Sequence, residues 1–203
     1  MQNSITWWKL NTLTQNIVFL LVVLAAIFVF AQISKKINKK RNDENAMVKV
    51  KKELKKLSKN PFYIVENFSM ANIDIQGVLI DSYGIVILRA IGQGTEVRGT
   101  YSDSQWQILD YKAHRKIDNP LLKMKALSEK MEKFLIKKKF EKTPIDNLVI
   151  FTDNHRKPNI NLGSGEKTII FEDLKKWYHS RESNKKMENS PERIYEILNQ
   201  GKK

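Results

Sequence analysis

The sequence predicts an α/β protein in which one N-terminal transmembrane helix precedes a small domain with a mixed β-sheet. Two observations support this prediction. An uncharged apolar run lies near the N-terminus, and short apolar segments of strand composition flank one long amphipathic helix further along the chain. With 203 residues, 41% of them hydrophobic, the chain is long enough for one ordinary domain but not for two full ones.

The transmembrane helix is predicted at residues 17–33, after a short N-terminus of residues 1–16. No charged residue occurs between Leu10 and Ser34. At about 1.5 Å per residue, the apolar centre spans roughly 26 Å, and it lacks the polar face of a core helix. The alternative is a cleaved signal peptide. In a signal peptide the positive charge precedes the apolar run, whereas here it follows.

Residues 34–60 form a basic juxtamembrane segment with eleven Lys or Arg and three acidic residues, which supplies more than half of the net charge of +14. The positive-inside rule therefore places the N-terminus outside the cell membrane and the C-terminal domain in the cytoplasm. Val50, Leu54 and Leu57 share one face of a predicted helix over residues 46–59. The side chains expected to contact anionic lipid headgroups are Lys35, Lys36, Lys39, Lys40 and Arg41.

The folded domain is predicted at residues 61–178, followed by a polar tail at residues 179–203. A cap at Asn119 and a proline at the first helical position predict a helix over residues 119–139. Because strands lie on both sides of this helix, a crossover between parallel strands is expected. Strands are expected at residues 62–65, 77–80, 85–91, 95–101, 105–109, 148–152 and 168–171, and short helices at residues 172–178 and 191–198.

Composition excludes several classes of site. The chain has no Cys, which excludes disulfides, Cys-based zinc sites, iron–sulfur clusters and Cys nucleophiles. It has three isolated His, too few for a His-based metal site. We therefore expect no cofactor. A high pI usually indicates nucleic-acid binding. The domain itself is nearly balanced in charge, which weakens that interpretation.

Four segments, in this order, resemble the bacterial nuclease-related domain family, NERD, of the PD-(D/E)xK nuclease fold. They are Val78–Leu88, Gly94–Gly99, Ile117–Leu127 and Leu148–Asp153, and the resemblance covers about residues 46–178. It implies a restriction-endonuclease-like domain, often preceded by a transmembrane helix. It also implies two carboxylates that hold Mg²⁺ and a lysine that activates water.

The resemblance places non-catalytic residues at these reactive positions. Aligned on Gly84, the two carboxylate positions are Gln76 and Arg89, and the lysine position is Ile91. The acidic position upstream falls near Met47. Because a guanidinium repels Mg²⁺, no catalytic residue and no metal ligand is assigned. The function expected from the resemblance is a pseudo-nuclease that binds or scaffolds nucleic acid or protein partners at the membrane.

Two alternatives remain open. An active, Mg²⁺-dependent, membrane-tethered nuclease would use a relocated site built on Asp74 and Glu96. A structural subunit of a secretion, transfer or division assembly would use the membrane helix to contact other membrane proteins. The residues proposed to bind DNA or RNA are Arg89, Lys112, His114, Arg115 and Lys116. The sequence leaves homo-oligomerisation undecided.

Overall fold

A computed structural model describes residues 4–58, 60–92, 94, 96–110, 113–152, 158–162 and 167–200. The chain divides into two compact units, Met1–Arg41 and Asn42–Lys203. Helix α1, Ser4–Leu57, contributes its first part to one unit and its last part to the other. The predicted boundary between residues 33 and 34 therefore falls inside a continuous helix.

The first unit contains the apolar part of α1. Residues Gln15–Ser34 are long and apolar enough to cross a membrane, with a mean hydropathy of 2.8, and none of them is buried. Their large side chains, such as Phe19 at 70% and Phe30 at 72% exposed, are open to the surroundings. A charge-free helix with apolar side chains all round suits lipid better than water. The predicted apolar helix at residues 17–33 is thus present, two residues longer at its N-terminal end and one at its C-terminal end.

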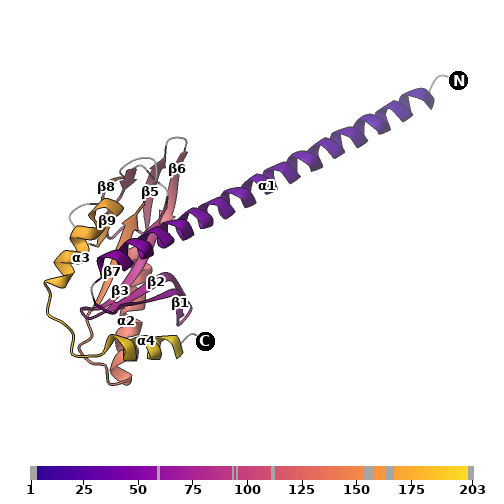
Figure 1. The fold of residues 1–203 in the computed structure, drawn as a ribbon. Coiled ribbons are helices and arrows are strands. Elements are labelled where there is room, and N and C mark those ends of the chain that lie inside the picture. Colours follow the sequence, from indigo (N-terminus) through magenta and orange to yellow (C-terminus); the bar gives the residue numbers. More distant parts are fainter. Residues whose placement is uncertain are drawn as a thin grey trace. The chain divides into compact units, whose positions relative to one another are not determined.

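The second unit is built on a five-stranded mixed sheet with the order β1-β2-β3-β7-β9 (Figure 1). The first three strands form an antiparallel meander, and β7 and β9 continue it parallel to β3. Their bounds are β1 Tyr63–Met70, β2 Ile73–Asp81, β3 Gly84–Ile91, β7 Ile145–Phe151 and β9 Thr168–Ile170.

Helix α2, Pro120–Lys137, lies between β3 and β7 in the chain, so the predicted crossover between parallel strands is confirmed. Its cap is also as predicted. Asn119 accepts a hydrogen bond from the backbone N–H of Leu121 at 3.0 Å, and Pro120 occupies the first helical position. The Asn119 amide nitrogen donates to the backbone of Tyr101 and Asp103, which fixes the helix start to the preceding loop.

A second sheet has the order β6-β5-β4-β8. Its strands β4, β5 and β6 lie between β3 and β7 in the chain, and β8 follows β7. The sequence predicted strands near β4 and β5, but neither β6 and β8 nor their assembly into a separate sheet. Trp106 on β5 is fully buried on the inner face, and its indole donates to the carbonyl of Thr100 at 2.8 Å. The strands are β4 Glu96–Arg98, β5 Gln105–Asp110, β6 Ala113–Asp118 and β8 Asn159–Asn161.

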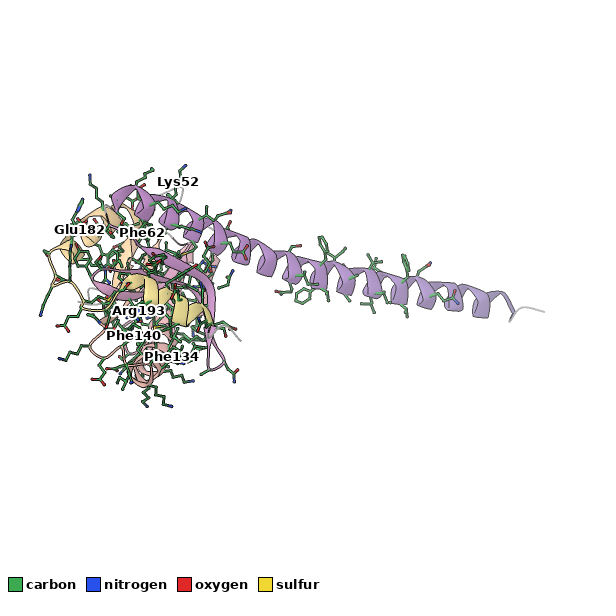
Figure 2. All side chains as sticks on the ribbon, turned by 60° about the horizontal axis from the view of Figure 1, so that its bottom comes forward. Lys52, Phe62, Phe134, Phe140, Glu182 and Arg193 are labelled. Carbon is green, nitrogen blue, oxygen red and sulfur yellow. The ribbon has the colours of Figure 1, made fainter. Side chains whose placement is uncertain are left out.

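The main sheet separates two hydrophobic cores. One contains residues of α2 and of α4, Pro191–Gln200, and the other contains the last turns of α1 and residues of α3, Leu174–Glu182. Figure 2 shows Phe134 and Phe140 together, away from Phe62. Phe134 and Phe140 pack against the first core, and Phe62 packs against the second.

The C-terminal residues belong to the compact unit, although they were predicted to be a polar tail. A 3-10 turn, η1 Phe171–Asp173, precedes α3, and α4 lies where the last short helix was predicted. Ile194 and Leu198 are fully buried, and the ring of Tyr195 stacks on that of Tyr63 at 4.7 Å. Arg181 forms a buried, two-point ion pair with Asp81 at 3.0 Å. These contacts attach residues beyond 178 to the sheet.

Candidate functional site

The candidate site lies beside α1, where the first half of β2 meets the end of β3. The β2–β3 ladder pairs Gly77 with Leu88, so Gln76 and Arg89 follow as the next cross-strand neighbours. On its other side, Gln76 faces Asn67, which has a left-handed φ of 48° and distorts the β1–β2 ladder. The two residues that the resemblance places at the carboxylate positions are therefore brought together.

Arg89 is neutralised by an acidic residue that the sequence analysis missed. Its Nη2 donates to Oδ2 of Asp43 on α1 at 2.7 Å. The second carboxylate oxygen of Asp43 accepts the backbone N–H of Gly92 at 3.1 Å. The Asp43 side chain is 9% exposed and that of Arg89 33%. A charge-assisted bond to a nearly buried carboxylate holds the guanidinium in place.

Gln76 completes this polar network. Its amide nitrogen donates to the backbone carbonyl of Asp43 at 2.5 Å, and its amide oxygen accepts the backbone N–H of Ala90 at 2.6 Å. A single amide thus connects α1 to the end of β3, and it uses both its donor and its acceptor. An aspartate at this position has no donor for the Asp43 carbonyl, so the network depends on glutamine.

The other two family positions are apolar and buried. Met47 and Ile91 are each 4% exposed. The Met47 side chain packs against Gly77 so closely that a Cβ there would overlap its terminal methyl group. Neither side chain offers a charge or a ligand atom to a hard cation.

A divalent metal does not fit this arrangement. Mg²⁺ and Mn²⁺ require several oxygen ligands, of which at least one or two are carboxylates. Among the described residues, the carboxylate that these contacts place here is that of Asp43, and it is engaged by a guanidinium and a backbone N–H. Within the described part of the chain, no three His, Asp or Glu side chains converge on a point that could hold a metal.

The two residues of the relocated site lie in different sheets. Asp74 is exposed near the β1–β2 turn, where it pairs with Ser69 across the ladder. Glu96 is on β4, where it accepts hydrogen bonds from Arg98 at 2.7 Å and from Asn161 at 3.2 Å. The hydrogen bond from Arg98 lowers the pKa of Glu96. The structure therefore separates the two carboxylates.

The proposed nucleic-acid residues are only partly brought together. His114, Arg115 and Lys116 follow one another on β6, so their side chains alternate between the two faces of that sheet. Arg115 pairs with the buried Ile108, whereas His114 and Lys116 are exposed on the outer face. Arg89 belongs to the other sheet, and Lys112 lies outside the described residues. The side chains predicted to contact lipid headgroups are likewise outside the described part: Lys35, Lys36, Lys39, Lys40 and Arg41.

One sequence pattern could have identified Asp43 as a buried residue. Asp43, Met47, Val50 and Leu54 follow a spacing of four, three and four residues, so Asp43 heads the buried stripe of α1. Arg89 is the only charged residue in the apolar strand β3 and needs an acidic partner. The sequence does not say which of the acidic residues that partner is, since α1 and β3 are far apart in the chain.

The fold defines an α/β domain with a mixed sheet, one crossover helix and a polar centre at the meeting point of α1, β2 and β3. The sequence model of the NERD family, the nuclease-related domain, matches residues 42–152, which is more than half of the chain. The chain belongs to this family. The match begins at Asn42, the first residue of the compact second unit, and ends after β7. No curated protein and no solved structure matches the chain significantly.

Proposed function

We propose that this chain is a single-pass membrane protein that presents a non-catalytic NERD domain to the cytoplasm as a binding or scaffolding module. The observation that carries the proposal is the ion pair between Arg89 and Asp43. A metal-dependent nuclease needs a cation held between carboxylates beside the scissile phosphate. In this chain the cation is a side chain, and its charge is matched by the Asp43 carboxylate. The guanidinium of Arg89 thus occupies the place beside Asp43 where a nuclease of this kind would hold its metal ion.

The membrane anchor rests on the apolar segment Gln15–Ser34 and on the charge around it. One lysine precedes this segment, and five basic residues follow it within seven positions. Positive charge on the cytoplasmic side therefore favours an outside N-terminus and a cytoplasmic domain. Basic side chains next to the bilayer add attraction to anionic lipids of about 1 kcal/mol each.

Nucleic acid is the partner that the domain's chemistry favours. One third of the Arg89 side chain remains exposed, and among the described residues only Asp43 accepts a hydrogen bond from its guanidinium. The other N–H groups are therefore open to a phosphate oxygen. His114 and Lys116 add basic groups on the outer face of the second sheet. Phosphate contacts of this kind give binding without sequence preference.

The binding test uses the full-length protein in detergent micelles and a labelled DNA duplex, titrated at several salt concentrations. We expect binding that weakens as salt rises, with a shallower salt dependence in Arg89→Ala, because one phosphate contact is lost. Arg193→Ala is the matched control, since Arg193 is an exposed arginine on α4. Absence of DNA and RNA binding even at low salt refutes the nucleic-acid version and leaves a protein partner.

Orientation is tested separately by protease protection. In sealed, right-side-out vesicles the C-terminal domain is expected to resist added protease until the membrane is opened. Digestion of the domain in intact vesicles would refute the cytoplasmic placement. Loss of the chain from the membrane fraction after an alkaline wash would refute the anchor itself.

A further inference from the structure

Helix α2 and the turn that follows it carry the excess positive charge of the folded domain. Residues 120–142 contain eight lysines and three glutamates, a net charge of +5. The domain predicted at residues 61–178 has a net charge of only +3, so the rest of it is slightly acidic. A surface that serves solubility alone has both signs interspersed, whereas here the positive charge is concentrated on one element.

The apolar side of α2 is used by the core. Helix α2 packs with α4 on one side of the main sheet (Figure 1). Its buried residues are Pro120, Leu121, Met124, Leu127, Met131 and Leu135. A helix that inserts into a lipid surface presents its apolar side to the bilayer, and α2 has no such side available. A partner of its open side is therefore recognised by charge.

Four exposed lysines follow one line along this open side. They are called the lysine row here and are Lys123, Lys130, Lys133 and Lys137. Lys123, Lys130 and Lys137 are seven residues apart, which is nearly two helical turns, and Lys133 lies about one turn from both of its neighbours in the row. At a rise of about 1.5 Å per residue, the row extends over about 21 Å.

The charge of these lysines is not neutralised within the described part of the chain. There, none of the lysines between residues 120 and 142 forms an ion pair, although three glutamates lie among them. Lys130 donates to the backbone carbonyl of Ala71 at 3.1 Å, and this acceptor carries no charge. A helix that presents unpaired cations in this way attracts a polyanion, because binding releases the counterions condensed on the polyanion.

The lysine row and Arg89 belong to the same side of the main sheet. Ile87 and Ile91 of β3 lie in the core that contains residues of α2. Side chains alternate along a strand, so Arg89, two residues from each, leaves β3 on this side as well. The hydrogen bond from Lys130 to Ala71 also places the row beside the turn that leads into β2.

We propose that the lysine row of α2 is the surface along which this domain binds the phosphate backbone of a nucleic-acid duplex. The inference rests on the nucleic-acid partner proposed above and adds four phosphate contacts to it. One strand of B-DNA carries a charge about every 3.4 Å, so the row faces about six phosphates. Contacts to phosphates position a duplex without reading its bases, so the binding has no sequence preference.

The test is fluorescence anisotropy of a labelled DNA duplex with the full-length protein in detergent, at salt concentrations from about 50 to 200 mM. The row variant carries Lys123→Gln, Lys133→Gln and Lys137→Gln. Lys130 is kept because it contacts Ala71. The plot of log affinity against log salt should be shallower than that of the wild type by about 2.7, because each lost contact contributes about 0.9.

A matched control variant removes the same charge from other places. It carries Lys125→Gln on α2 outside the row, Lys175→Gln on α3 and Lys185→Gln, and all three lysines are exposed. Its slope should differ from that of the wild type by less than about 0.9. Equal changes in the two triple variants overturn the proposal, because the effect would then come from net charge alone.

The outcomes separate this inference from the proposed function. A wild type that binds neither DNA nor RNA at low salt refutes the nucleic-acid partner itself. Binding that weakens in Arg89→Ala but not in the row variant overturns the row alone. Both triple variants are expected to keep the urea midpoint of the wild type, because exposed charges contribute little to stability. If the row variant unfolds, the three single substitutions replace it, and each is expected to reduce the slope by about 0.9.

Discussion

Replacing Arg89 with glutamate is predicted to destabilise the domain and to create a metal site. The guanidinium lies 2.7 Å from the Asp43 carboxylate and is one third exposed. Unit charges about 4 Å apart interact by about 4 kcal/mol at an effective dielectric constant of 20. Screening by the solvent on the exposed side reduces this to about 1–2 kcal/mol. Because Arg89→Glu exchanges attraction for repulsion, the free energy of unfolding should fall by about 2–4 kcal/mol.

The introduced carboxylate would stand beside that of Asp43, which gives a divalent cation the two acidic ligands that it lacks in the wild type. Mn²⁺ at a hundred times its dissociation constant would then raise the free energy of unfolding of Arg89→Glu by about 2.7 kcal/mol. The wild type should not respond. Cleavage should not return in this variant, because buried Ile91 still occupies the position of the family lysine.

The assay is urea unfolding of the full-length protein in detergent, followed by tryptophan fluorescence with and without Mn²⁺. Trp106 is fully buried and reports the folded domain. Arg193→Glu is the control, because it makes the same charge change on the exposed face of α4. Equal stability of Arg89→Glu and wild type, or stabilisation of the wild type by Mn²⁺, would refute the role given to the ion pair.

Three further predictions concern the stability of the domain. Asp81→Leu and Arg181→Leu should each cost about 3–5 kcal/mol in denaturant unfolding, because each leaves a buried partner uncompensated. The variant that carries both substitutions should recover most of the loss. An uncoupled double-mutant cycle would contradict this. Burial raises the pKa of Tyr178, so stability should fall as the pH rises above the ordinary tyrosine value of 10.0, where the unfolded chain ionises first. Unfolding curves across that range should show the fall in the wild type but not in Tyr178→Phe. Gly92→Ala should lower the free energy of unfolding by about 1–3 kcal/mol, and with it the melting temperature, because the new Cβ would overlap the backbone carbonyl of Asn42. An unchanged melting temperature would count against that contact.

Much of the fold could be predicted because its signals are local. The cap at Asn119, the apolar run of β3 and the spacing of Val50, Leu54 and Leu57 each depend on neighbouring residues. They identified α2, the central strand and the buried face of α1. The parallel crossover followed from the order of the elements, because strands lie on both sides of the long helix.

The second sheet and the partners in the site could not be predicted in this way. Strand β8 has three residues, too few for a periodic pattern. Strand β6 is rich in charged residues, a composition that is more typical of a loop. The Asp43–Arg89 and Asp81–Arg181 pairs join residues 46 and 100 positions apart. The fold topology decides which residues pair over such sequence separations. Gln76 and Arg89 were therefore predicted as site residues, but their partner Asp43 was not.

Whether the domain holds a catalytic divalent cation is best tested by metal-dependent cleavage with the purified full-length protein. Single-stranded and duplex DNA and RNA would be incubated with Mg²⁺ or Mn²⁺, alongside the Asp74→Ala variant prepared in the same way. We expect the same background cleavage in wild type and variant, with and without metal. Cleavage that requires the metal and disappears in Asp74→Ala would show that a divalent cation is held by acidic groups after all.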